Sequence, residues 1–187
     1  MAINTENINT GGARVSIGAR TNLNVAENSH VSGLTSSTDL GATTGGVKIT
    51  YTYETQDIFC DQHLAPIETA VISESATIEF EMLETDSENL RYIIDLYQSY
   101  DSSNAKLTSV GGQTSITYYA LVLEIADNDN NDRDVTWTFF KVRSQGIETN
   151  YERENPTTAK VTFIAYADTS YSSGYQLFSI KEELIAP

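Results

Sequence analysis

Polar and apolar side chains alternate strictly along two separated stretches of this chain. In residues 47–54 the apolar side chains occupy the odd positions, and in residues 77–82 they occupy the even positions. A period of two indicates a strand with one face buried and one face in water. Residues 115–125, 135–142 and 160–167 are more uniformly apolar, which predicts strands covered on both faces. The pattern therefore predicts a mainly β protein.

One segment has helical spacing instead. Its apolar positions predict a single stripe that packs against a sheet: Leu90, Ile93, Ile94 and Tyr97. Thr85 with Glu88 fits a capping box, and Asp86 is an alternative N-cap. We expect a helix over residues 87–100, ending before a turn-forming Asp-Ser-Ser-Asn run.

Residues 1–46 differ in composition from the rest of the chain. They hold seven of the eleven glycines and no Phe, Trp or Tyr. Such a segment buries too little apolar surface to organise a core of its own. We therefore divide the chain into an N-terminal arm (1–46), with short strands at 13–19 and 29–34, and one β-rich domain (47–187). Two interpretations of the arm stay open: a flexible tail, or a segment that becomes ordered against a neighbouring subunit.

The charge of the chain limits its partners. The formal net charge is −15, and between Glu54 and Asp95 there are eleven acidic residues and one base, Arg91. Clustered Lys and Arg are what nucleic acids and anionic membranes require, so binding to either is not expected. Cys60 is the single cysteine, which excludes an intrachain disulfide. The start has no secretion signal and no apolar run is long enough to span a membrane, so a soluble protein made in a cytoplasm is expected.

The best candidate for a metal site is the loop 127–134, whose sequence is DNDNNDRD. Asp127, Asp129 and Asn131 match the first three ligand positions of a calcium loop. Its sixth position is Asp132 instead of Gly, and its twelfth is Thr138 instead of Glu. A solvated hairpin loop is therefore the favoured interpretation, and no metal site is predicted.

No catalytic or cofactor site is predicted either. His30, His63 and Cys60 have no recognisable ligand or triad spacing, and no Gly-x-Ser-x-Gly elbow is present. Glu79 and Glu81 lie on one face of a strand. That placement suits a plain acidic surface better than a glycosidase pair, so the protein is not expected to be an enzyme.

Three blocks of sequence, taken in order and with their spacing, resemble the major tail tube proteins of tailed bacteriophages. They are residues 38–54 (TDLGATTGGVKITYTYE), residues 76–94 (ATIEFEMLETDSENLRYII) after an acidic loop, and residues 136–168 (TWTFFKVRSQGIETNYERENPTTAKVTFIAYAD). The resemblance covers most of the chain after residue 37. Residues 13–46 depart most from the family pattern.

The resemblance implies a tail-tube-type β-sandwich or barrel flanked by one α-helix, with the N-terminal arm and a long loop added. It implies a virion structural protein, assembled in the host cytoplasm into hexameric rings that stack as the tail tube, through which DNA passes to the host. The implied partners are copies of this chain, the tail terminator, the tape-measure protein and baseplate or tip proteins. Passing DNA would be met without specific binding, and no membrane is involved.

The resemblance assigns roles to three groups of residues. Candidate lumen-facing residues, in an acidic wall that keeps contact with DNA weak, are Glu79 and Glu81, then Glu54 and Thr52; the alternative is that they face outer solvent. Candidate inter-ring contacts on the long loop 55–75, beside the N-terminal arm, are Phe59, Leu64, Pro66 and Ile67. The helix would contribute Leu90, Ile93 and Ile94 to the core.

Two other functions remain open. A carbohydrate-binding β-sandwich would suit the many tyrosines and the Asp- and Asn-rich loops. It would need exposed aromatic side chains on one face, whereas Trp137, Phe139 and Phe140 lie in an apolar strand that is expected to be buried. A tube protein of the type VI secretion kind would share the fold and the ring.

Overall fold

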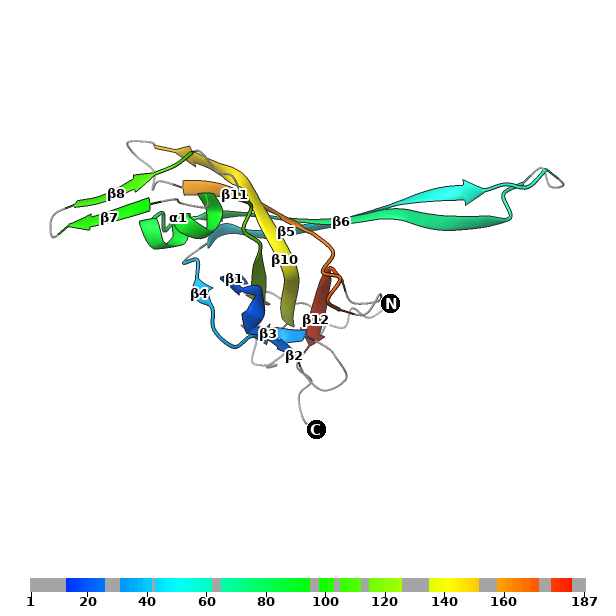
Figure 1. The fold of residues 1–187 in the computed structure, drawn as a ribbon, viewed down its shortest axis with the longest axis horizontal. Coiled ribbons are helices and arrows are strands. Elements are labelled where there is room, and N and C mark those ends of the chain that lie inside the picture. Colours follow the sequence, from blue (N-terminus) through cyan, green and yellow to red (C-terminus); the bar gives the residue numbers. More distant parts are fainter. Residues whose placement is uncertain are drawn as a thin grey trace, which may run out of the picture.

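The computed structural model is mainly β, with antiparallel sheets and one α-helix among the residues it describes (Figure 1). The described residues are 13–25, 31–41, 43–61, 65–94, 98–102, 105–111, 115–125, 135–151, 158–171 and 176–182. The elements are β1 (Ala13–Ala19), η2 (Arg20–Asn22), β2 (Leu23–Val25), β3 (Val31–Leu34), β4 (Thr38–Asp39), β5 (Thr43–Ile58), β6 (Glu68–Met82), α1 (Ser87–Ile94), β7 (Gln98–Ser102), β8 (Ala105–Ser109), β9 (Tyr119–Ile125), β10 (Val135–Asn150), β11 (Thr158–Ala165) and β12 (Phe178–Glu182).

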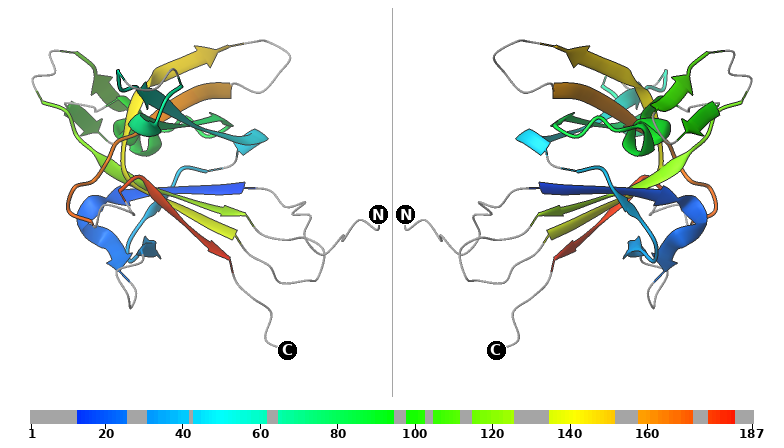
Figure 2. Two further views of the ribbon diagram at one scale, coloured as in Figure 1. Left: turned by 90° about the vertical axis from the view of Figure 1, so that its right-hand side faces the viewer. Right: turned by 90° about the vertical axis from the view of Figure 1, so that its left-hand side faces the viewer.

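The main sheet has the order β4-β1-β9-β10-β11-β6-β5, and β12 pairs with β10 beside this path. The first part of β10, Val135–Phe139, pairs with both β9 and β12. From Val142 onward β10 pairs with β11, and register shifts follow Phe139 and Ser144. Such bulges bend a strand. β10 thus joins two half-sheets, β4-β1-β9-β10-β12 and β10-β11-β6-β5, which face each other across the core (Figure 2).

The core lies between these half-sheets. The burial of β6 confirms the prediction, made from its alternating sequence, that one face of this strand is buried. Ala76, Ile78, Phe80 and Met82 are buried, whereas the side chains between them are not. Phe80 stacks on Phe163 of β11 with ring centroids 6.0 Å apart. The same cluster takes residues from β1, β9, β10 and α1.

The prediction that a strand is covered on both faces is confirmed for β9 and is wrong for β11. Ala120, Leu121, Val122 and Leu123 are all buried, and β3 contacts β9, β10 and β12. In β11, by contrast, buried residues alternate with partly or fully exposed ones such as Lys160. The prediction for 160–167 was wrong because the polar face of β11 continues the water-facing side of β6.

The helix is shorter than predicted. The Asp86 carboxylate accepts a hydrogen bond from the Asn89 N–H at 2.8 Å, so Asp86, the alternative N-cap, begins α1. α1 ends at Ile94. The predicted end of the helix near Tyr100 was wrong. Tyr100 pairs with Leu107 in the β7–β8 hairpin, so this part of the chain forms a strand instead of a further helical turn.

The N-terminal strand lies inside the main sheet. β1, which matches the strand predicted at 13–19, pairs with β9 along its whole length, and Val15 and Ile17 are fully buried. β3 confirms a strand within 29–34. β5 runs through residue 46. The described residues between 13 and 41 therefore belong to the same folded unit as the residues after 46; residues 1–12, 26–30 and 42 lie outside the described part.

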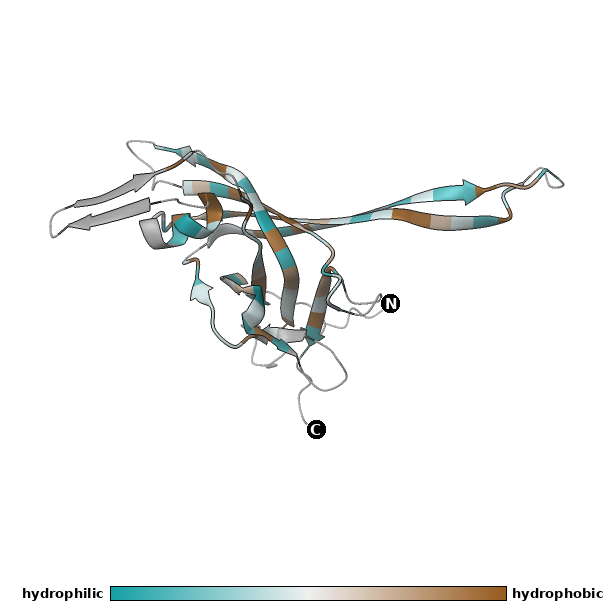
Figure 3. Ribbon diagram, viewed as in Figure 1, coloured by the Kyte–Doolittle hydropathy of each residue, from teal (hydrophilic) through white to brown (hydrophobic). Residues whose placement is uncertain are grey.

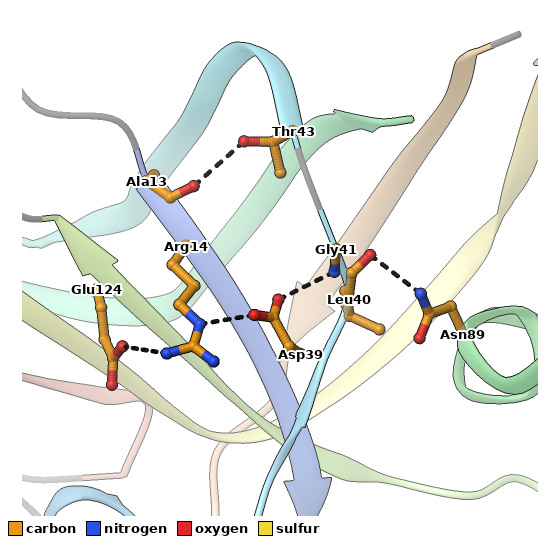
Figure 4. A network of polar contacts seen from close by, with 8 residues as sticks. All are labelled: Ala13, Arg14, Asp39, Leu40, Gly41, Thr43, Asn89 and Glu124. Carbon is orange, nitrogen blue, oxygen red and sulfur yellow. Dashed lines mark hydrogen bonds and ion pairs between the residues drawn. The ribbon is translucent and has the colours of Figure 1, made fainter. Parts of the chain in front are cut away.

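Polar contacts tie β1 to its surroundings (Figure 4). The Arg14 Nε donates to Asp39 Oδ2 at 2.7 Å, and its Nη1 lies 3.8 Å from Glu124 Oε2. Asn89 of α1, itself buried, donates from Nδ2 to the Leu40 carbonyl at 3.3 Å. Arg14 of β1 is thereby connected to β9, and Leu40 is connected to the helix.

An ion pair between Arg20 and the buried Asp168 lies at the other end of β1. Asp168 is only 3% exposed. Its Oδ2 accepts hydrogen bonds from Arg20 Nε at 3.1 Å and from Arg20 Nη2, and its Oδ1 accepts from the Ser170 N–H at 3.1 Å and the Ser170 hydroxyl at 2.8 Å. Burial raises the pKa of the Asp168 carboxyl, but these hydrogen bonds outweigh it, so the pKa lies below its ordinary value.

Candidate assembly surfaces

Strands β5 and β6 continue far beyond the rest of the sheet. β11 ends at Ala165, opposite Ala76 of β6, but β5 and β6 remain paired as far as Ile58 and Glu68. Residues 52–58 of β5 and 68–75 of β6 therefore form a two-stranded ribbon that projects from the rest of the fold (Figure 1). We call this ribbon the arm; it is not the N-terminal arm of residues 1–46.

The arm corrects the prediction of a long loop over 55–75. Its strands are held by polar cross-strand pairs, such as the Thr52 and Ser75 hydroxyls at 2.8 Å and the Thr69 hydroxyl donating to Asp57 Oδ1 at 2.8 Å. The prediction failed because a ribbon with water on both faces has no buried side and therefore little hydrophobic alternation. A register shift after Glu54 leaves Ile72 as an extra residue, which disturbs the alternation further.

Large apolar side chains are exposed along the arm, and Figure 3 shows a hydrophobic stretch within its β6 strand. Tyr53, Phe59, Ile67, Val71 and Ile72 are each between 55% and 63% exposed. An isolated two-stranded ribbon is marginally stable in water, and its open edges invite pairing with another chain. Contiguous exposed apolar surface is typical of protein interaction sites.

Three of the predicted inter-ring residues, Phe59, Pro66 and Ile67, lie at the far end of the arm, which we call the tip (residues 58–61 and 65–67). Phe59 and Ile67 are 63% and 55% exposed, and Pro66 is exposed beside them. The Ile67 N–H donates to the Ile58 carbonyl at 2.9 Å and closes the pairing. Leu64 lies outside the described residues.

The four predicted lumen residues share one face of one half-sheet. On β6, Glu79 and Glu81 point away from the core face of Ile78 and Phe80. Thr52 pairs with Ser75 and Glu54 pairs with Ser73, which places both on the same side as Glu79 and Glu81. We call this side of β10-β11-β6-β5 the outer face.

The outer face is nearly balanced in charge. Lys48 Nζ donates to Glu79 Oε2 at 3.0 Å, and this pairing lowers the pKa of the Glu79 carboxyl. Lys160 stands between Glu81 and Glu148 in the sheet register. In the described residues, carboxylates such as Glu54, Glu79, Glu81 and Glu148 share this face with the cations Lys48, Arg143 and Lys160. The described residues of the outer face therefore carry only a small part of the net charge of −15.

The half-sheet β10-β11-β6-β5 has two open edges. Among the described strands, none pairs with β5 on the side away from β6, and none pairs with residues 143–149 of β10 on the side away from β11. All neighbouring strands are antiparallel. β5 and β10 consequently run in opposite directions at the two ends of the half-sheet.

The remaining predicted residues are placed as follows. Ile93 is buried in the core, Ile94 packs against it and Leu90 is half-buried. Cys60 lies half-buried at the tip. Thr138 is buried in the middle of β10, whereas His30, His63 and the calcium-like positions of the 127–134 loop lie outside the described residues. In the described part of the chain, no three His, Cys, Asp or Glu side chains are grouped to hold a metal ion.

A scan against protein-family models and a search of curated proteins each found no match to this chain. Within the described residues, no helix has both the length and the apolar character needed to cross a membrane.

Proposed function

We propose that this chain is the structural subunit of a bacteriophage tail tube, located in the virion tail. Copies of it would form rings, six per ring as the family resemblance implies, that stack into a conduit for DNA. The observation that carries the proposal is the arm, which projects two paired strands into solvent without support from the rest of its own chain. An element of this kind becomes stable when other copies cover it.

The two open edges of the half-sheet support ring closure. Four strands per copy alternate in direction, so β5 of one copy meets β10 of the next in antiparallel orientation. Repetition around a ring then gives one continuous barrel with no remaining edge. The core face of each half-sheet is already covered, so the outer face would line the lumen.

The chemistry of the outer face suits passage of DNA. Lys48 pairs with Glu79, and Lys160 stands between Glu81 and Glu148 in the sheet register, so DNA phosphates meet no row of free positive charge. Hydroxyl groups such as those of Thr50, Thr52 and Thr77 occupy much of the remaining surface. A wall of this composition neither grips DNA nor depends on strong repulsion.

The test is an arm-replacement variant in which an Asn-Gly turn replaces residues 52–75. We expect the full chain, when concentrated, to form rings or hollow tubes in negative-stain electron microscopy. The variant should stay monomeric and still unfold cooperatively in a thermal melt, because the arm lies outside the core. A full chain that remains monomeric at high concentration, or a variant that assembles equally well, would contradict the proposal.

A carbohydrate-binding module is the second candidate. Tyr51 and Tyr53 are 44% and 62% exposed with ring centroids 6.2 Å apart, and Glu74 faces Tyr53 across the ribbon. Partial burial and then the Glu74 carboxylate raise the pKa of the Tyr51 hydroxyl. Aromatic rings beside a carboxylate suit a sugar. Saturable binding in a glycan screen that is lost in Tyr53→Ala would favour this function.

A further inference from the structure

An open groove of about 550 Å³ lies where the arm leaves the body. One wall comes from the arm, with Tyr51, Val71 and Ile72, and the other comes from Ala167, Leu177 and Phe178. We call it the root groove. Both walls offer apolar surface, and the polar residues Ser73, Glu74 and Gln176 lie beside it. Such a groove suits an apolar side chain on a segment that also carries polar groups.

The root groove is anchored to the core. Leu177 is 8% exposed and belongs to the core cluster, and Phe178 packs against that cluster. The Phe178 ring lies 5.8 Å from Tyr51 and 5.4 Å from Trp137 between centroids. This wall is therefore preformed. The arm wall, in contrast, leaves Val71 and Ile72 more than half exposed, because the extra residue in β6 places these neighbours at the surface.

The tip carries apolar side chains of matching character. Ile58, Phe59 and Ile67 are 41%, 63% and 55% exposed, and they cluster where the two strands meet. The tip is separated from the root groove by eight residues of extended strand, from Tyr51 to Ile58. At about 3.3 Å per residue this is roughly 25 Å. A tip on a paired ribbon cannot fold back into its own groove.

We propose that the tip of one copy docks in the root groove of a second copy. Seven of the twelve large apolar side chains exposed in the described residues lie between positions 51 and 72, at the groove or toward the tip. An unrelated partner would cover one of these surfaces. A second copy covers both at once, because every copy supplies one tip and one groove. The contact is heterologous, so it repeats from copy to copy.

This inference rests on the proposed function, since it specifies how the arm holds neighbouring copies together. Cys60 at the tip is the single cysteine of the chain, which makes it a reporter. In a Glu74→Cys variant, a second thiol lines the root groove, because Glu74 lies on the same side of the ribbon as Tyr51 and Tyr53. Cysteines can be bridged only when their Cα atoms lie within about 7 Å. A disulfide between Cys60 and the new thiol must therefore join two copies.

The experiment is mild oxidation of the assembled variant, followed by a non-reducing gel. We expect a ladder of linked chains that extends beyond dimers, because linkage of tip to groove leaves a free thiol at each end. A chain with one cysteine gives dimers at most. Ser37→Cys, at an exposed position before β4, is the matched control and should give no ladder. Gln176→Cys places the thiol on the opposite wall and should reproduce the ladder.

Failure of this inference can be distinguished from failure of the proposed function. If electron microscopy shows tubes but neither groove variant forms a ladder beyond that of Ser37→Cys, the docking site is wrong and assembly stands. If neither tubes nor linked chains form, both are overturned. In a Cys60→Ser, Glu74→Cys background, maleimide labelling should slow several-fold on assembly. Equal labelling before and after assembly would show an open groove and overturn the inference.

Discussion

Replacement of Asp168 by asparagine tests whether the buried ion pair with Arg20 stabilises the fold through its charge. The substitution keeps the size of the side chain and one acceptor oxygen, but it removes the negative charge. One of the two sets of donors, on Arg20 or on Ser170, must then face an amide NH2 group instead of an oxygen.

The magnitude follows from the burial of the two partners. Removal of one partner from a fully buried ion pair costs about 3–5 kcal/mol. Asp168 is buried, but the Arg20 side chain is 34% exposed, so water compensates part of the loss for Arg20. We therefore expect the free energy of unfolding to fall by about 2–3 kcal/mol at pH 7.

The effect should depend on pH in one direction. The folded-state pKa of Asp168 lies below its ordinary value, which is about 3.9 in an unfolded chain. The carboxylate therefore contributes its full stability above about pH 4–5, and the contribution is lost as the pH falls through the folded-state pKa. The difference between wild type and Asp168→Asn should shrink below about pH 4 for the same reason.

Urea unfolding of both proteins between pH 7 and pH 3, at dilutions where they sediment as monomers, measures this difference. Asp39→Asn is the matched control, because Asp39 pairs with Arg14 at the surface, and should change stability by less than about 1 kcal/mol. A loss that stays constant down to pH 3 would refute the reasoning, because it would reflect altered packing instead of lost charge.

Two further predictions concern the half-sheet β10-β11-β6-β5. Lys48→Gln should raise the pKa of Glu79 toward its ordinary value in an NMR titration while changing the unfolding free energy by less than about 1 kcal/mol, because the pair is exposed; an unchanged pKa would argue against the pair. Phe163→Ala should cost about 3–5 kcal/mol in urea unfolding, because its fully buried ring stacks on Phe80. Tyr151→Ala, at a 76% exposed position, should stay within about 0.5 kcal/mol, and equal losses would contradict the core assignment.

The body of the fold could be predicted wherever one face of a strand is buried. The alternation of residues 76–82 identified the core face of β6 because every second side chain meets the opposite half-sheet. The same period of two was enough to place Glu79 and Glu81 on one face. That Thr52 and Glu54 join this face depends on the register of β5 on β6, which spacing along the chain does not reveal.

The arm could not be predicted because neither of its faces is buried, so its sequence shows little hydrophobic alternation. Thr52, Glu54, Ser73 and Ser75 form cross-strand pairs in water, and such residues are equally common in loops. The charge of the outer face was also hidden. Lys160 lies opposite Glu81 in the register of β11 on β6, although the two residues are nearly eighty positions apart along the chain.

The N-terminal segment shows the limit of an argument from composition. Residues 1–46 contain no aromatic side chain, so an independent core was not expected. Val15 and Ile17 are nonetheless fully buried, because β9 and the opposite half-sheet provide the rest of their surroundings. A few apolar residues suffice when the partner strand supplies most of the buried surface.

The pairing of β1 with β9 has a consequence for synthesis on the ribosome. Ala13 pairs with Ile125, more than a hundred residues later in the chain. By contrast, β5 and β6 are close in sequence and can pair soon after β6 has left the ribosome. The edge of β1 that pairs with β9 must therefore stay unpaired for much of translation. A segment rich in glycine and free of aromatic side chains can keep this edge unpaired with little tendency to aggregate. The composition that argued against a separate core thus suits a strand that is made first and inserted late.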